Sequence, residues 1–284
     1  MRVLGLDTST DTGGVALVEN GRLLPEYTLN LHTPHSERLL PAVERVLEDA
    51  GFGPGDKPDA VAAALGPGSF TGVRIGVVTA KALSAALGVP GVGVLTLEAL
   101  AYQMRGVAPW AAPVMDARNG NVYTALYDVR GPVPEPVVPP ALRAAEPWFA
   151  SLEREPAEAP AAGGAAGGPI VFGGDGLFAY GDAIRRLAGG RARLAPAGFE
   201  VLRSGAVAVL GALKLARGEA GDPATLTPVY LRKSEAERKW EARSRTPSPT
   251  GLSPCGSGTW ARSWKWRSGR SARRGPGRPS CPSC

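Results

Sequence analysis

The first 242 residues of this 284-residue chain contain no cysteine, because Cys255, Cys281 and Cys284 all lie beyond them. A disulfide framework is therefore excluded from this part of the chain. Histidine is almost as scarce, with only His32 and His35. These absences leave little from which to build a Ser-His or Cys-His nucleophile system.

Long apolar runs and an N-terminal signal sequence are also missing. No apolar run approaches the roughly 18 residues that a membrane-spanning helix needs. The N-terminal stretch MRVLGLDTSTD carries an acid where a signal peptide would have its apolar region. We therefore expect a soluble, cytoplasmic protein that has no membrane partner.

Acidic residues are absent from the C-terminal tail. Residues 243–284 contain nine Lys and Arg and no Asp or Glu, whereas residues 1–242 carry 23 basic and 26 acidic side chains, a net charge of about −3. The tail has one Leu and no Ile, Val or Phe, so it cannot bury enough apolar surface to fold. We predict that it is disordered or is the product of a shifted reading frame in a GC-rich gene.

Two alternatives for this tail stay open. One is a basic arm that binds nucleic acid by stacking, for which Trp260, Trp264 and Trp266 are interleaved with Arg and Lys. The other is a zinc site, for which three cysteines are one ligand short of the usual four.

Two similar halves precede the tail. In the first, VLGLD at 3–7 is an apolar strand that ends in an acid, and Asn20-Gly21 predicts a hairpin. In the second, WAAPVMD ends at Asp116, and Asn119-Gly120 again precedes an alternating strand. Further strands and helices follow in both, which predicts an internally duplicated α/β protein of two lobes. The predicted boundaries are 1–105 for the first lobe, 106–242 for the second and, within the second, 131–169 for a Pro- and Ala-rich insertion.

A helix with one apolar stripe is predicted over SERLLPAVERVLEDAG, from residue 36 onward. Pro41 would remove a backbone hydrogen bond from the second turn if the helix began at Ser36. A start near Arg38 avoids this conflict.

The stretch ALGPGSFTGVRIGVVTAKALSAALG at 64–88 surrounds a second helix start with glycines. Such loops bind phosphate, but the spacing fits neither the dinucleotide nor the Walker pattern. Small residues instead recur every four positions, at Gly72, Gly76, Ala80, Ser84 and Gly88. Glycine within a helix costs about 1 kcal/mol of helix stability relative to alanine. We therefore expect a compensating gain, such as a helix or strand that packs closely against this face. Three interpretations stay open: the chain's own core, a docking surface for a partner helix, and an anion site at 68–71.

Five stretches carry a family resemblance: LGLDTSTDTGGVAL, HSERLLP, GPGSFTGVRIGVVTAKAL, MDARNGNVYTALY and PVYLRKSEAE. Together they resemble the TsaB (YeaZ-type) family over residues 1–240. The resemblance implies an actin/sugar-kinase-like (ASKHA) fold of two ribonuclease-H-like lobes. It also implies a non-catalytic accessory subunit in the formation of threonylcarbamoyladenosine at adenosine 37 of tRNA. The implied partners are a TsaD-like transferase, a TsaE-like ATPase, tRNA only indirectly, and a second copy of the chain when it is alone.

The resemblance also implies where the transferase binds. In that family the helices of the N-terminal lobe pack against the same helices of TsaD, which here are 36–50 and 71–87. The predicted contact residues are Leu39, Val43, Val46, Gly72, Val73, Gly76, Val77 and Ala80.

No catalytic residue or cofactor is expected. Nucleotide-binding members of this fold place glycines directly after the first-strand acid, but here Asp7 is followed by Thr8 and Ser9. We predict a vestigial phosphate loop in which Asp7 caps the loop through these two residues. An independent metal-dependent glycoprotease-like or ATP-binding enzyme of the same fold is the alternative.

No metal ion is expected either. The catalytic relative binds its metal through two histidines one helical turn apart, where this chain has Thr96 and Leu100, and neither replaces an imidazole ligand. A three-ligand site can be drawn from His32, His35 and Glu37, but a solvated loop fits these residues better.

Overall fold

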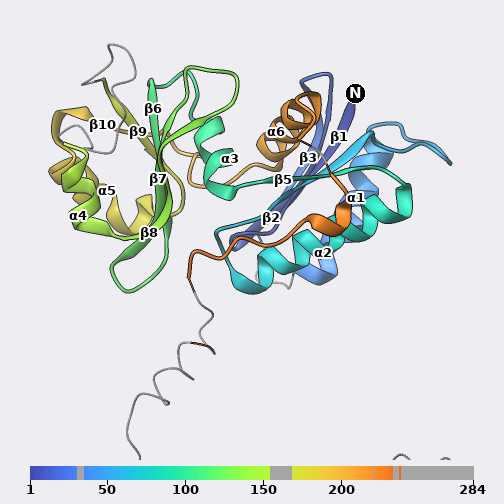
Figure 1. Ribbon diagram of the computed structural model, residues 1–284, viewed down its shortest axis with the longest axis horizontal. Coiled ribbons are helices and arrows are strands. Elements are labelled where there is room, and N and C mark those ends of the chain that lie inside the picture. The colour runs from blue at the N-terminus through green and yellow to red at the C-terminus, as the bar shows by residue number, and fades with distance from the viewer. Residues whose placement is uncertain (31–34, 154–167, 220, 233–236, 238–284) are drawn as a thin grey trace, which may run out of the picture. The chain divides into compact units, whose positions relative to one another are not determined.

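The computed structural model describes residues 1–30, 35–153, 168–219, 221–232 and 237 (Figure 1). The first lobe is a five-stranded sheet in the order β3-β2-β1-β4-β5. β1 pairs antiparallel with β2 and parallel with β4. Asn20 and Gly21 both have positive φ, so the predicted hairpin turn is confirmed. The strands are β1 (Arg2–Asp7), β2 (Thr12–Glu19), β3 (Arg22–Asn30), β4 (Ala60–Ala64) and β5 (Gly91–Val94).

Helices cover both faces of this sheet. α1 (His35–Asp49) and α2 (Phe70–Leu87) pack with Leu4 and Leu6 of β1 in one apolar cluster. α3 (Thr96–Gln103) and α6 (Ser204–Ala216) pack with Val3, which points to the opposite face, in another. Successive side chains of a strand alternate between faces, so β1 contributes to both layers.

The second sheet repeats the first. Its order is β10-β9-β6-β7-β8, with β6 antiparallel to β7 and parallel to β9. The second sheet therefore has the strand order and pairing of the first, with β6 in the place of β1. This confirms the duplication that was inferred from two apolar strands that each end in an acid. The strands are β6 (Trp110–Asp116), β7 (Asn121–Asp128), β8 (Glu135–Ala144), β9 (Ile170–Gly173) and β10 (Ala192–Leu194), with α5 (Leu177–Leu187) following β9 and the 3-10 turn η1 (Gly189–Arg191) preceding β10.

Part of the predicted insertion at 131–169 is regular structure. β8 and α4 (Ala145–Ser151) lie within it, so treating this stretch as an excursion was wrong. Prolines hid the strand: Pro136, Pro139 and Pro140 all fall in β8. Because β8 is an edge strand that pairs only with β7, it tolerates residues without an N–H group.

The second predicted boundary also needs correction, because residues from Ser204 onward return to the first lobe. α6 packs on β1, β2 and β4. Its close approach depends on small residues: a Cβ on Gly5 would lie 2.6 Å from the Ala208 backbone nitrogen, and one on Gly211 would overlap with the Ala62 Cβ. The second lobe therefore ends before Ser204 and not at residue 242, and the first lobe is built from two separate stretches of chain. Residues 238–284, which include the basic tail, lie outside the described residues.

Two helix predictions are corrected. α1 begins at His35 and contains Pro41, so the start near Arg38 was wrong. α2 is long and apolar enough by length and composition to cross a membrane, contrary to the expectation that no such run exists. Its glycine side packs against the loop after β1, and core helices of folded domains can have the same length and composition.

Candidate functional site

The loop after β1 lies beneath the start of α2. Asp7, Thr8 and Ser9 are each at most 2% exposed. A carboxylate oxygen of Asp7 accepts a 2.9 Å hydrogen bond from the Ser9 N–H, so the prediction that Asp7 caps this loop is confirmed. The Thr8 hydroxyl donates to the Gly72 carbonyl oxygen at 2.7 Å, and the Ser69 N–H donates to the Ser9 carbonyl oxygen at 2.7 Å.

The glycines of α2 permit this contact. A Cβ on Gly68 would overlap with the Ser9 carbonyl oxygen, and one on Gly72 or Gly76 would overlap with an oxygen of Thr8. The space over the β1–β2 loop is thus filled by the chain's own helix. Of the three interpretations of the glycine face, the chain's own core fits the structure.

The eight predicted contact residues lie in this core. Val73, Val77 and Ala80 are at most 1% exposed, and Leu39 and Val43 are 3% exposed. The remaining three, Val46, Gly72 and Gly76, are buried as well. As surface contacts these assignments were wrong, because this side of the two helices packs on the sheet and on the loop after β1.

A different stripe of α2 is exposed. Val78 is 63% exposed, and on α1 Leu40 is 50% exposed. The exposed α2 stripe also contains Thr71, Arg74, Ala82 and Ala85. We call this stripe together with Leu40 the α1–α2 outer face. Both helices lie on the same side of the first sheet and pack against each other.

A C-terminal segment, residues 221–232, runs along the flank of α2 (Figure 1); we call it the strap, and it includes the short turn η2 (Pro223–Thr225). The Lys81 ammonium donates to the carbonyl oxygens of Ala224 and Leu226 at 2.8 and 3.2 Å. The Val229 N–H donates to the Leu65 carbonyl oxygen at 2.7 Å. Sequence analysis identified PVYLR of this segment only as part of a family motif, and the segment's lack of a periodic pattern predicted no place for it in the fold.

Carboxylates gather at the ends of β6 and β9. The Asp116 N–H donates to Asp175 at 3.1 Å. Burial raises the pKa of the Asp175 carboxyl to about 6, and the charges of Asp116 and Asp11 act in the same direction. Sequence analysis identified Asp116 but not Asp175, which only the fold brings beside it.

The metal-ligand positions of the catalytic relative are filled by core residues. Thr96 is fully buried and Leu100 is 2% exposed. Within the described ranges, no group of three or more His, Cys, Asp or Glu residues could hold a metal ion. His35 and Glu37 belong to the first turn of α1, so the prediction that they lie in a loop was wrong. His32 and the side chain of His35 lie outside the described residues, which leaves the three-ligand site untested.

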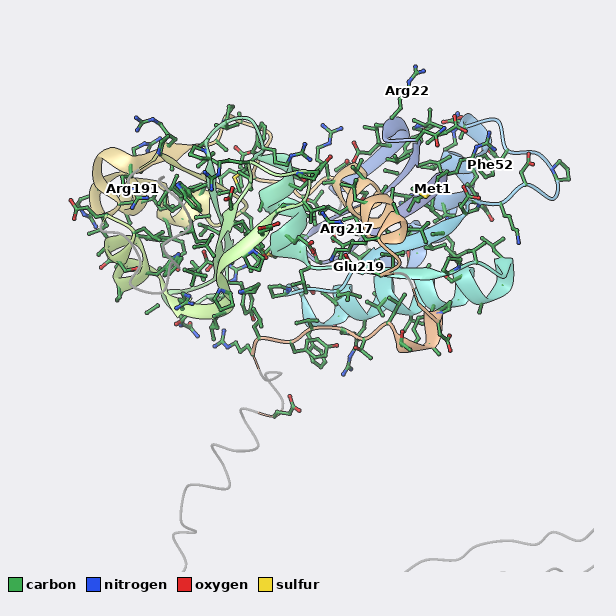
Figure 2. The ribbon with its side chains drawn as sticks, turned by 45° about the horizontal axis from the view of Figure 1, so that its top comes forward. Met1, Arg22, Phe52, Arg191, Arg217 and Glu219 are labelled. Carbon is green, nitrogen blue, oxygen red and sulfur yellow. The ribbon has the colours of Figure 1, made fainter. Side chains whose placement is uncertain are left out.

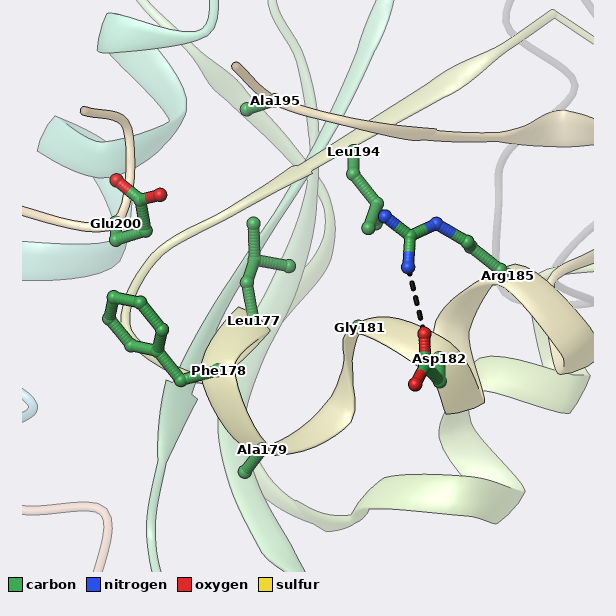
Figure 3. Close-up of a pocket in the computed structure, with 9 residues that line it drawn as sticks. All are labelled: Leu177, Phe178, Ala179, Gly181, Asp182, Arg185, Leu194, Ala195 and Glu200. Atoms are coloured by element: carbon green, nitrogen blue, oxygen red, sulfur yellow. Dashed lines mark hydrogen bonds and ion pairs between the residues drawn. The ribbon is translucent and has the colours of Figure 1, made fainter. Parts of the chain in front are cut away.

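A pocket of about 330 Å³ lies beside α5 and β10 (Figure 3). Phe178, which is 80% exposed, stands at its rim. Asp182 and Arg185 form an ion pair at 2.8 Å, and Glu200 accepts a hydrogen bond from the Gly198 N–H at 2.6 Å. The charged groups of this pocket are therefore already engaged within the chain.

The two sheets, with the same strand order and the same pairing pattern, define an actin/sugar-kinase-like protein of two ribonuclease-H-like lobes. A family model described as TsaD, tRNA N6-adenosine threonylcarbamoyltransferase, matches residues 22–240. The chain is 36% identical over 240 residues to the tRNA threonylcarbamoyladenosine biosynthesis protein TsaB of Bacillus subtilis, which covers 84% of this chain and 98% of that protein. The structure of YeaZ from Pseudomonas aeruginosa matches with a TM-score of 0.64 at 29% identity, covering 81% of this chain and 99% of that one. The chain belongs to the TsaD family and, within it, is a protein of the TsaB/YeaZ type.

Proposed function

We propose that this chain serves in the biosynthesis of threonylcarbamoyladenosine in tRNA, as a non-catalytic cytoplasmic subunit that docks on a TsaD-type transferase. The TsaB relatives, which are proteins of tRNA threonylcarbamoyladenosine biosynthesis, support the pathway. The α1–α2 outer face supports docking, because Val78 and Leu40 together expose apolar surface on adjacent helices. Exposed apolar side chains mark a protein–protein contact where they form one contiguous patch.

The filled β1–β2 loop supports a role without nucleotide chemistry of its own. Phosphate oxygens need close access to backbone N–H groups, whereas here Thr8 and Ser9 are covered by the first turn of α2. A subunit of this kind acts on its partner's equilibrium. The transferase has a competent and a non-competent arrangement, and docking favours the competent one. The shift can be no larger than the difference between the docking free energies to these two arrangements.

A TsaE-type ATPase is proposed to join this pair, with tRNA bound by the complex and not by this chain alone. When the transferase is absent, a second copy could cover the same apolar surface. Sedimentation of the chain with and without transferase separates these cases, because a shared surface makes the two associations mutually exclusive.

The test is reconstitution of the modification on tRNA with the other purified pathway proteins, with and without the full chain. Threonylcarbamoyladenosine is measured by mass spectrometry of digested tRNA. We expect formation to depend on the added chain and to fall with the double variant Leu40→Asp/Val78→Asp. Val107→Asp is the matched control, because Val107 is a 44% exposed apolar residue outside both helices. Equal modification without the chain would reject the accessory role and reopen the independent-enzyme interpretation.

A further inference from the structure

Arg74 occupies an unusual position at the start of the α2 stripe. Its guanidinium lies over the Phe70 ring at 4.0 Å and over the Tyr230 ring at 5.7 Å. Its Nε donates to the Tyr230 hydroxyl at 2.8 Å. The two rings are themselves 4.6 Å apart, so an element of the strap and the first turn of α2 together orient one exposed arginine.

This arginine has no acidic partner in the part of the chain that the structure describes, where no carboxylate lies within ion-pair distance of it. The sequence of α2 contains no Asp or Glu. Its other cation, Lys81, is engaged by carbonyl oxygens of the strap. The N-terminal half of α2 is therefore positively charged and uncompensated within these residues.

The geometry leaves the recognition edge of the guanidinium available. Arginine has five N–H donors, and among the described residues the side chain of Arg74 makes one hydrogen bond, through Nε. The terminal nitrogens can bind a carboxylate in two parallel hydrogen bonds. Because the stacking rings already restrict the side chain, less conformational entropy is lost when a partner binds.

The surroundings favour a protein partner. Arg and Tyr are enriched among the residues that dominate binding energy in protein interfaces, and here they adjoin the apolar stripe that continues through Val78. A carboxylate placed against Arg74 would complement the charge of α2 while the partner's apolar residues cover the stripe.

We propose that Arg74, oriented by Phe70 and Tyr230, receives an Asp or Glu side chain of the transferase and is a specificity-determining residue of docking. This inference rests on the proposed function. It adds the chemistry of the contact: an acidic residue beside apolar ones on the partner.

The test measures the Kd between the full chain and the TsaD-type transferase of the same organism by calorimetry. Arg74→Gln should weaken binding about 10- to 100-fold, and Arg74→Lys should also weaken it because an ammonium lacks the planar fork. Arg22→Gln is the matched control. Arg22 projects from the β2–β3 turn, far from α2 (Figure 2), and its variant should bind like the unchanged chain.

A purely structural role of Arg74 predicts a different pattern, with a lower Tm of the isolated chain and no dependence on the partner's acids. We expect instead that one Asp→Ala or Glu→Ala substitution on the transferase abolishes the difference in Kd between the unchanged chain and its Arg74→Gln variant. If no acidic substitution couples with Arg74, or if Arg74→Gln binds normally, the inference is rejected while the docking function stands. If the unchanged chain fails to bind, the proposed function itself fails.

RNA is the other class of partner that an exposed arginine beside aromatic rings could bind. Titration of the isolated chain with unmodified tRNA separates the two. Binding that is lost in Arg74→Gln would assign Arg74 to phosphate or base contact and overturn the carboxylate proposal. The expected result is the same weak or absent tRNA binding for both chains.

Discussion

The hydroxyl of Thr8 donates a 2.7 Å hydrogen bond to the carbonyl oxygen of Gly72. This bond joins the loop after the first strand to the first turn of α2, two segments 64 residues apart. It depends on glycine, because a Cβ at residue 72 would overlap with the Thr8 carbonyl oxygen. The same relationship explains why the small-residue face of α2 is unavailable to a partner.

Gly76→Leu should therefore destabilise the isolated chain. The new side chain would overlap with the Thr8 hydroxyl, and overpacking a core costs about 1–3 kcal/mol in the free energy of unfolding. Urea denaturation measures the change. Ala82→Leu introduces the same residue at an exposed position of the same helix and should change stability by less than about 0.5 kcal/mol. Equal effects at the two positions would contradict the close packing of Gly76 against Thr8.

Stability should fall as pH rises through the pKa of Asp175. The folded-state value of about 6 lies above the value of about 3.9 expected in the unfolded chain. The folded state therefore binds more protons between these values, and the penalty for burying the charge is absent below about pH 4 and complete above about pH 6.

Asp175→Asn should remove most of this dependence and stabilise the chain at pH 7.5, by of the order of 2 kcal/mol. The amide oxygen can still accept the hydrogen bond from the Asp116 N–H. Urea titrations at pH 5 and pH 7.5 measure the effect, with Asp182→Asn as a control because the Asp182 side chain is 97% exposed. An unchanged pH dependence in Asp175→Asn would show that another group is responsible.

The Glu98–Lys214 ion pair joins α3 to α6 at 2.8 Å, with side chains only 9% and 16% exposed. Removing one partner leaves the other charge buried, which costs about 3–5 kcal/mol. We expect both Glu98→Gln and Lys214→Met to destabilise strongly and the double variant to be more stable than the sum of the two losses predicts. A double-mutant cycle by chemical denaturation measures this coupling. Strict additivity would mean that the pair does not interact.

Tyr127→Phe should leave stability unchanged or raise it slightly. The phenol is 2% exposed and its hydroxyl has no hydrogen-bond partner among the described residues. Burial, together with the charge of Glu98, raises the pKa of Tyr127, so the hydroxyl stays protonated. Removing an unsatisfied buried hydroxyl is close to neutral or favourable, within about 1 kcal/mol. A drop in Tm of several degrees would reveal a hydrogen bond to this hydroxyl.

Much of the fold could be read from local patterns. The two strand-to-acid openings and the two Asn-Gly turns predicted the duplication because turn chemistry and strand alternation depend on neighbouring residues. β8 was missed because its prolines resemble a loop, and their tolerance depends on a place at the sheet edge that sequence does not reveal. The strap was missed because it is held by Lys81 and Leu65 of distant segments.

The sequence by itself determined the α/β class, the duplication, the small-residue face of α2 and the capping role of Asp7, since each is encoded over a few neighbouring residues. Only the tertiary structure decided which face of α2 is buried. The four-residue spacing of Gly72 and Gly76 requires a close neighbour, but a neighbour from the same chain and one from a partner satisfy that requirement equally well. Thr8, brought there by the sheet, fills the space, and this leaves Val78 and Arg74 on the outside.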